Sequence, residues 1–227
     1  MKLVFLCRRR SDLSHARYAE LLLGGHVPIA LRHHPTMAQY VVNIVERSSP
    51  GAEELDSIGE LWFPSLADFR ERLYDSPEGQ RVVERDVAGF MGGAHAYATT
   101  EHVQKSTTPD APLGTRSPGV KTICPIVRAP GLTHDAFVDH WLDRHVPLAL
   151  RHHPGVVRYV TNVVDERLSP AGPALDGIAE LHFASEDSRR NAMFDSPEGE
   201  RIVREDMGRF MGTTWAYDVA EYAQKRT

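Results

Sequence analysis

The sequence contains few cysteines, and it has no pattern of a disulfide framework. Only Cys7 and Cys124 occur among its 227 residues, and both lie in apolar segments with the composition of strands. Structural disulfides belong mainly to small, cysteine-rich chains in oxidising compartments. We therefore predict two buried free thiols in a reducing compartment.

Long apolar runs and an excess of basic residues are missing as well. No stretch approaches the roughly 18 apolar residues that span a bilayer, and the N-terminus lacks a signal-peptide core with a cleavage site. The formal net charge is −5, whereas proteins that bind nucleic acids or anionic membranes cluster Lys and Arg. We expect a cytoplasmic protein with neither nucleic acid nor membrane as a partner.

Motifs for common cofactors are also missing. The sequence has no GxGxxG after a strand, no P-loop, no nucleophile elbow and no HExxH. The pairs His33-His34 and His152-His153 suggest metal ligands, but adjacent side chains diverge in a helix or strand, and no further ligand stands at a usual spacing. We therefore predict that the protein uses no metal and no cofactor.

What the sequence does contain is an internal repeat. "HVPIALRHHP" (26–35) returns as "HVPLALRHHP" (145–154), and residues 2–105 align with residues 121–225 at an offset of 119 that becomes 120 near Glu166. The segment between them is rich in Pro, Gly, Ser and Thr, as linkers are. We predict two copies of one unit, at 1–105 and 120–227, joined by a linker at 106–119.

Each copy has the pattern of four strands and two helices. A Ser or Thr precedes the first helical stretch, and a Ser-Pro pair precedes the second, as expected of a helix N-cap and first helical residue. A proline two residues after His26 or His145 is expected to end the first helix there. The predicted order is βαββαβ, with second helices at 77–90 and 197–210 and strands at 2–7, 37–45, 57–63 and 94–103 in the first copy and 121–127, 156–164, 177–183 and 214–223 in the second.

The strands are apolar on both faces, which makes a single copy unstable by itself. Its two helices can cover one face of a four-stranded antiparallel sheet, and the other face needs a second cover. Two copies in one chain can bury each other's sheets. We predict an α+β fold in which two ferredoxin-like βαββαβ repeats pack as an intramolecular, pseudo-dimeric α+β barrel.

Two sets of acids lie among apolar neighbours. Asp86 and Asp206 stand between apolar residues spaced four apart on the second helix of each copy. Glu60 and Glu180 are flanked by apolar residues on the same face of a strand. A buried carboxylate needs a fixed partner, so each acid either lines a pocket or accepts bonds from the backbone or an arginine, such as Arg32 or Arg151.

Histidines end the first helix of each copy. Phe137, Trp141 and His145 are spaced four apart, so His145 completes the core-facing stripe, and His26 has the equivalent place in the first copy. An imidazole there could move a proton to or from a substrate, because histidine titrates near neutral pH. The alternatives are a core histidine bonded to backbone and a cation that stabilises the helix C-terminus.

Three segments carry a family resemblance. Residues 132–162, "GIAELHF" (177–183) and "DSPEGERIVREDMGRF" (195–210) resemble the EthD family of the dimeric α+β barrel superfamily. The resemblance covers both copies and is better in the second, since "ELLLGGH" replaces "DHWLDRH" in the first. EthD-like proteins are associated with ether-degrading oxidation systems, or act as dehydratase- or decarboxylase-like enzymes. The wider superfamily includes isomerases, cyclases, cofactor-free monooxygenases and haem proteins.

The resemblance also implies candidate catalytic residues. The recurrent polar positions of the family fall, in the second and first copy, on His145, Tyr159, Asn162, Glu180 and Asp206, and on His26, Tyr40, Asn43, Glu60 and Asp86. Tyr159 and Asn162 are three residues apart, so a regular strand places them on opposite faces. His182 in the second copy stands where the first has Trp62. We favour the second copy, because it has His140, Trp141, His182 and Trp215 at the positions where the first has Leu21, Leu22, Trp62 and His95.

We predict a cofactor-independent enzyme, of lyase or isomerase type, that acts on a small apolar substrate of aromatic or polyketide-like character. His145 or His26 would move the proton, Asp206 or Asp86 would orient the histidine, and the Tyr and Asn pairs would polarise a carbonyl or hydroxyl. The alternatives are an accessory protein that carries a hydrophobic intermediate, and a cofactor-free monooxygenase. A homodimer of the two-repeat chain is a further partner to test. The candidates for substrate binding are Phe137, Trp141, Arg151, Trp215, Tyr217 and Trp62.

Overall fold

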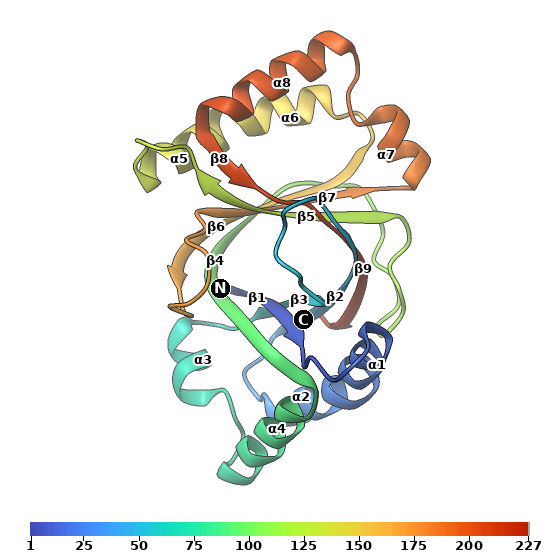
Figure 1. The fold of residues 1–227 in the computed structure, drawn as a ribbon, viewed down its shortest axis with the longest axis vertical. Coiled ribbons are helices and arrows are strands. Elements are labelled where there is room, and N and C mark those ends of the chain that lie inside the picture. Colours follow the sequence, from blue (N-terminus) through green and yellow to red (C-terminus); the bar gives the residue numbers. More distant parts are fainter. Residues whose placement is uncertain (227) are drawn as a thin grey trace.

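A computed structural model describes residues 1–226 and shows a mixed α+β fold built around a closed antiparallel barrel. The helices lie outside the barrel on two opposite sides, those of the first half on one side and those of the second half on the other (Figure 1). No helix of residues 1–226 is long and apolar enough to cross a membrane. The predicted α+β barrel is confirmed.

The first half contributes four strands and a helical layer. Its order is β1 (Lys2–Arg9), α1 (His15–Glu20), η1 (Leu21–His26), α2 (Val27–His33), β2 (Gln39–Ser48), β3 (Ser57–Trp62), α3 (Leu66–Arg72), α4 (Pro77–Phe90) and β4 (Met91–Ser106). Ser76 caps α4 by accepting a hydrogen bond from the Gly79 backbone N–H, as the Ser-Pro pair predicts. The short helix α3 was not predicted.

The second half repeats this order. It consists of β5 (Val120–Arg128), α5 (His134–His140), η2 (Trp141–His145), α6 (Val146–His152), β6 (Val156–Arg167), β7 (Gly177–Phe183), α7 (Glu186–Ala192), α8 (Pro197–Phe210), β8 (Met211–Thr214) and β9 (Tyr217–Lys225). The strands β8 and β9 together correspond to β4. They are separated at Trp215-Ala216, where Ser49 of the first half exchanges hydrogen bonds with Ala216.

The barrel closes because each half pairs with the other at both edges. Around the ring the strand order is β4-β1-β3-β2-β9-β5-β7-β6, and β6 pairs with β4. The two junctions between the halves are β2–β9 and β4–β6. Full closure leaves no unpaired strand edge in this ring to recruit another chain.

The expected end of the first helix at His26 and His145 is wrong. Each helix continues through a π-helical turn and then for seven more residues, to His33 or His152. The backbone N–H of Val27 bonds to Leu22, and that of Val146 to Trp141, five residues back in both cases. This wider turn stands directly before Pro28 and Pro147, where it accommodates the missing N–H and the proline ring.

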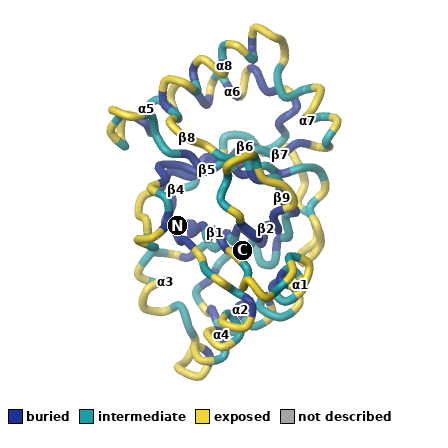
Figure 2. Tube along the Cα trace, in the orientation of Figure 1, coloured by how far each residue is buried: buried dark blue, intermediate teal, exposed yellow. Residues whose placement is uncertain are grey.

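The buried apolar residues form three cores, and Figure 2 shows where the buried residues lie along the chain. One apolar core fills the barrel, and a further core in each half lies between the outer face of the sheet and the helices. Buried residues follow the strands, while the outer faces of the helices are exposed. Both faces of the strands are therefore covered, as their composition requires.

Candidate functional site

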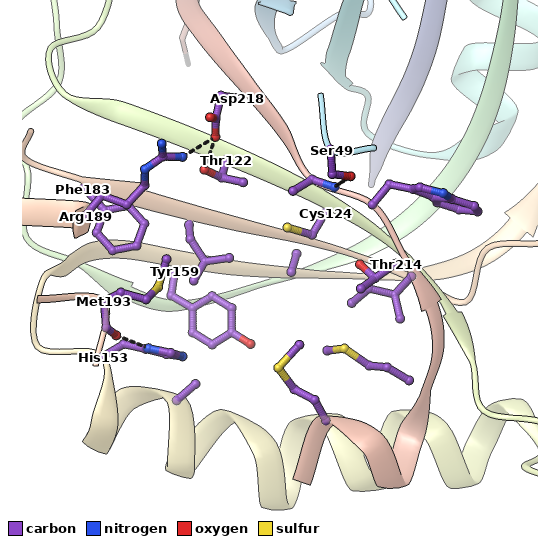
Figure 3. A pocket seen from close by; sticks show the side chains of 18 of the residues that line it. Ser49, Thr122, Cys124, His153, Tyr159, Phe183, Arg189, Met193, Thr214 and Asp218 are labelled. Atoms are coloured by element: carbon purple, nitrogen blue, oxygen red, sulfur yellow. Dashed lines mark hydrogen bonds and ion pairs between the residues drawn. The ribbon is translucent and has the colours of Figure 1, made fainter. Parts of the chain in front are cut away.

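A cavity of about 600 Å³ lies between the sheet and the helices of the second half. Its walls are mostly apolar (Figure 3). The apolar lining includes Ile126, Leu181, Phe183, Met193, Phe194, Met207 and Met211. A cavity of this size, with a few polar groups in an apolar wall, is typical of a site for a small organic molecule.

His145 lines this cavity from the end of the π-helical turn η2. Its Nδ1 lies 2.9 Å from Oδ2 of Asp206 in α8, and Nε2 of His140 lies 2.9 Å from the other carboxylate oxygen. Both imidazoles pack on the Phe210 ring. Asp206 is buried but does not line the cavity, so it can orient His145 without touching a ligand.

The surroundings of His145 set its protonation. Burial lowers the pKa of His145 below its ordinary value, although the Asp206 carboxylate acts in the opposite direction. The imidazole is therefore neutral at neutral pH. Because Nδ1 is held by Asp206, Nε2 is the nitrogen that can accept a proton from a bound molecule.

The first half repeats the contact between a histidine and an aspartate in a smaller cavity. His26 Nδ1 lies 2.8 Å from Asp86 Oδ2, and burial lowers the pKa of His26, against the effect of Asp86. Leu21 stands at the position of His140, so Asp86 has one imidazole partner here. Tyr40 also lines this cavity.

Larger side chains account for the smaller cavity. It measures about 250 Å³. The rings of Phe5 and Phe69 line it, at the positions that Cys124 and Arg189 have in the second half. The preference for the second copy as a binding site therefore has a steric basis.

Tyr159 contributes a phenol to the second cavity. Its hydroxyl accepts a hydrogen bond of 3.3 Å from Nε1 of Trp141, which is fully buried behind the cavity. Burial raises the pKa of Tyr159 well above its ordinary range, so the phenol keeps its proton. It can donate a hydrogen bond to a carbonyl or hydroxyl oxygen of a ligand.

Trp141 can hold Tyr159 only because position 177 is glycine. A Cβ at Gly177 would overlap the Trp141 ring. We expect Gly177→Ala to lower the free energy of unfolding by about 1–3 kcal/mol through overpacking and to change the tryptophan fluorescence. The control is Gly208→Ala, where an added Cβ meets nothing within 4 Å and a gain of about 0.5–1 kcal/mol is expected. Equal denaturation midpoints for the two variants would contradict this packing argument.

A polar wall lies on the sheet side of the second cavity and joins the halves. Asp218 of β9 accepts hydrogen bonds from Thr122 at 2.7 Å and from Arg189 at 2.6 Å (Figure 3). Arg47, at the end of β2, forms a salt bridge of 3.0 Å with the same carboxylate. The first half thus supplies part of the second cavity, together with Ser48 and Ser49.

The adjacent histidine pairs diverge as predicted, but one member has a place that the sequence did not reveal. His152 is buried and contacts the Asp195 carboxylate, whereas His153 contacts the Met193 carbonyl oxygen and lines the second cavity. Burial lowers the pKa of His153. His34 lines the first cavity in the same manner. The sequence held one signal for this position, because adjacent residues at a helix end point in different directions. One histidine of each pair could therefore be expected to face the interior.

Glu60, Glu180, Asn43 and Asn162 lie inside the barrel and do not share a cavity with His145 or His26. This corrects the expectation that they complete those sites. Asn43 and Asn162 donate to Glu60 and Glu180 at 2.6 and 2.8 Å. Because strand residues alternate between faces, the outward direction of Tyr159 turns Asn162 inward.

The partners of the two glutamates are lysines that the sequence reasoning missed. Lys2 contacts Glu60 at 2.6 Å and Glu180 at 2.5 Å, and Lys121 contacts the same two carboxylates at 2.5 and 2.9 Å. All four side chains are at most 3% exposed. Glu101 and Glu221 complete this cluster, on Lys2 and Lys121 respectively. The proposed pairing with Arg32 or Arg151 is wrong, because both arginines are exposed.

The predicted substrate-binding residues are separated by the fold. Trp215 lines the second cavity. Trp62 and His182 lie at one end of the barrel, and Tyr217 points into the barrel and donates to the Glu53 carbonyl oxygen. Phe137 and Trp141 are buried in the helix–sheet core. The exposed Arg151 lines neither cavity, because it lies on the outer side of α6.

Within residues 1–226, no group of three or more His, Cys, Asp or Glu side chains is arranged to hold a metal ion. Cys7 and Cys124 are free thiols, the first buried and the second half-buried. Burial raises the pKa of each to about 12, so neither is a thiolate at neutral pH.

Comparison with known proteins gives one family and a set of similar folds. A model of the EthD domain matches residues 10–94 and 129–214. No curated protein sequence matches the chain. The crystal structure of an anthrone oxidase-like protein is 12% identical, with a TM-score of 0.62, and the alignment covers 98% of this chain and 92% of that one.

Two further structures have the same fold at low identity. A protein from Fusobacterium nucleatum, provisionally named a monooxygenase, is 6% identical with a TM-score of 0.63, covering 100% of this chain and 95% of the other. A mutant chlorite dismutase from Candidatus Nitrospira defluvii is 11% identical with a TM-score of 0.52, covering 96% and 91%. At these identities the likeness concerns the fold alone.

Proposed function

Because the chain belongs to the EthD family over most of its length, we propose that it is an enzyme that moves a proton on a small apolar molecule in the second cavity. The observation that carries this proposal is the His145–Asp206 pair at the wall of a 600 Å³ apolar cavity. A neutral imidazole, oriented by a carboxylate, is the usual general base of such reactions.

The chemistry follows from the two polar groups that the cavity offers. His145 Nε2 removes a proton from carbon or oxygen of the substrate, and the Tyr159 hydroxyl stabilises the negative charge that develops on a neighbouring oxygen. The imidazolium then returns the proton to another atom of the substrate, which gives an isomerisation, or to a leaving group, which gives a lyase reaction. The methionine and phenylalanine lining favours an aromatic or polyketide-like body.

The experiment is proton exchange in D₂O. The full chain is incubated with a panel of hydroxyaromatic compounds and β-dicarbonyl compounds, and exchange of carbon-bound hydrogen is followed by NMR. We expect catalysed exchange or rearrangement of at least one compound. A compound that binds tightly in the second cavity, yet shows neither exchange, turnover nor oxygen uptake, would support the accessory binding protein and overturn the enzyme.

A second candidate is cofactor-free oxygenation, in which the anion formed by His145 reacts with O₂. It is favoured by the names of similar structures, an anthrone oxidase-like protein and a provisional monooxygenase. Oxygen uptake with the same panel distinguishes it from lyase and isomerase chemistry. A Soret band in the purified protein would indicate haem instead.

We also infer that residues 1–105 and 120–227 are two ferredoxin-like repeats with a linker at 106–119. The matching strand orders β4-β1-β3-β2 and β9-β5-β7-β6 support this division. In the described residues the segment from Thr107 to Gly119 contains no helix or strand, apart from a single bridge at Arg116.

A further inference from the structure

A third cavity opens at one end of the barrel, on the other side of strands β6 and β7 from His145. It measures about 390 Å³ and is lined by polar and charged groups. Among its lining residues are Trp62, Glu101, Arg158, His182 and Glu221, together with parts of the linker. Phe183 lines both this cavity and the second-half cavity, so the two spaces lie on opposite faces of the same strands.

Arg158 lines this cavity without a hydrogen-bond or ion-pair partner among residues 1–226. Within residues 1–226 its side chain makes no hydrogen bond and has no carboxylate within 4 Å, and its Nε is buried without an acceptor. The residue is only partly exposed. A guanidinium with five donors is costly to remove from water unless an acceptor faces it. The N–H donors of Arg158 therefore require an acceptor that residues 1–226 do not supply.

His182 is the cross-strand neighbour of Arg158, and its side chain also has a buried nitrogen without a hydrogen-bond partner among residues 1–226. The two residues are opposite each other in the β6–β7 register. Nε2 of His182 is buried without a hydrogen-bond partner in the described chain, and the nearest carboxylate oxygen, on Glu221, is 4.0 Å away. Burial and then the Lys121 charge lower the pKa of His182 to about 3, so the imidazole is neutral and has one N–H to donate.

The two lining glutamates do not compete for Arg158, because both are engaged elsewhere. Glu101 accepts bonds from Lys2 at 3.0 Å and from the Trp62 indole at 3.2 Å. Glu221 accepts bonds from Lys121 and from Ser117, both at 2.8 Å. At the rim, Lys225 bonds to a backbone carbonyl and Arg226 lies 3.6 Å from Asp110. Burial lowers the pKa of Arg158, but the charges of Glu180, Glu221, Glu60 and Glu101 raise it above its ordinary value. The guanidinium therefore has negative charge nearby but no acceptor in contact with it. A singly charged acceptor can take that place, whereas a doubly charged anion would be repelled more strongly by the four glutamates.

We propose that this end of the barrel is a second ligand site, which takes a small organic carboxylate through the Arg158 guanidinium and the His182 imidazole. A carboxylate is planar and pairs with the arginine fork through two parallel hydrogen bonds. Trp62, Phe183 and Val103 provide apolar surface for a compact body attached to it. The site is independent of the proton-transfer site and does not rest on that proposal.

The internal repeat supplies a natural comparison. In the first half the positions of Arg158 and His182 are occupied by Gln39 and Trp62, which are also opposite each other, in the β2–β3 register. The anion-binding pair thus occurs on one side of the barrel end only. Arg158→Gln installs the residue that the other half already carries in the same structural setting, so the variant should fold.

The test uses the full chain and sodium benzoate as the probe. The imidazole signals of His182 are assigned in the NMR spectrum with the His182→Gln variant, and benzoate is titrated against the wild type. We expect a saturable shift of the His182 signals, and an affinity that falls about tenfold or more in Arg158→Gln. Benzamide, the neutral analogue, and inorganic phosphate should both bind more weakly than benzoate.

The charge-matched control is Arg151→Gln, which removes an exposed arginine that does not line this cavity and should leave benzoate binding unchanged. Thermal unfolding gives a second measurement, because benzoate should raise the melting temperature of the wild type and not that of Arg158→Gln. Absence of a saturable His182 shift, equal affinity for benzoate and benzamide, or full binding by Arg158→Gln would each overturn the site.

Discussion

The His145→Gln variant is expected to lose turnover by about 10²–10⁴-fold, the usual contribution of a positioned general base. His26→Gln should keep most of the activity, because the first cavity measures only about 250 Å³ and contains two phenylalanine rings. The two variants are a matched pair, since both histidines contact an aspartate through Nδ1 at the same place in the repeat. Full turnover in His145→Gln, with loss in His26→Gln, would assign the reaction to the first half.

Asp206→Asn tests whether Asp206 acts through His145. The carboxylate raises the pKa of His145 against the effect of burial, so its removal should lower that pKa further. Activity that depends on neutral His145 rises as the pH passes this pKa, and the acid limb of the rate profile should therefore move to lower pH. A purely structural role would reduce activity without moving the limb.

Glu180→Ala is expected to lower the free energy of unfolding by about 3–5 kcal/mol, because it leaves Lys2 and Lys121 in the barrel without one of their two shared partners. The measurement is a denaturant titration. The control is Glu205→Ala, which breaks an exposed pair with Arg201 and should cost less than about 1 kcal/mol. A cost for Glu180→Ala as small as that of the control would show that the cluster is not a major source of stability.

The difference in unfolding free energy between the wild type and Glu180→Ala should depend on pH. Burial would raise the pKa of Glu180, but Lys121 and Lys2 lower it well below its ordinary value. The stabilisation is therefore present above the unfolded-state pKa, about 4.3 for glutamate, and is lost as the pH falls through the folded-state pKa. The gap in stability between wild type and Glu180→Ala should narrow in acid.

Much of the fold could be read from local signals. Ser196 and Pro197 fix the start of α8 by capping chemistry, and the apolar composition of both strand faces requires a closed barrel. The continuation of each helix past Pro28 and Pro147 could not be predicted, because the π-helical turn before the proline already departs from the ordinary helical hydrogen-bond pattern, so the missing proline N–H does not break the helix. That turn packs against α4 in the first half and α8 in the second.

The candidate site was predicted in part. The His145–Asp206 and His26–Asp86 contacts join two helices that the repeat places at matching positions, and their residues were identified from helical spacing. The barrel cluster was missed because each lysine contacts a glutamate of the other half as well as one of its own, and the spacing within one copy does not reveal such a contact. One signal was present, since Lys2 and Lys121 are isolated charges at equivalent places in apolar strands. A buried glutamate needs a cation, and these lysines were the buried candidates.

The two junctions, β2–β9 and β4–β6, join segments of one polypeptide. A barrel assembled from two separate subunits would dissociate on dilution and would have to carry every substitution twice. Covalent linkage removes both constraints. The halves can diverge independently, so one copy can specialise in chemistry while its twin is retained as scaffold, and the assembled state does not depend on how much protein the cell makes.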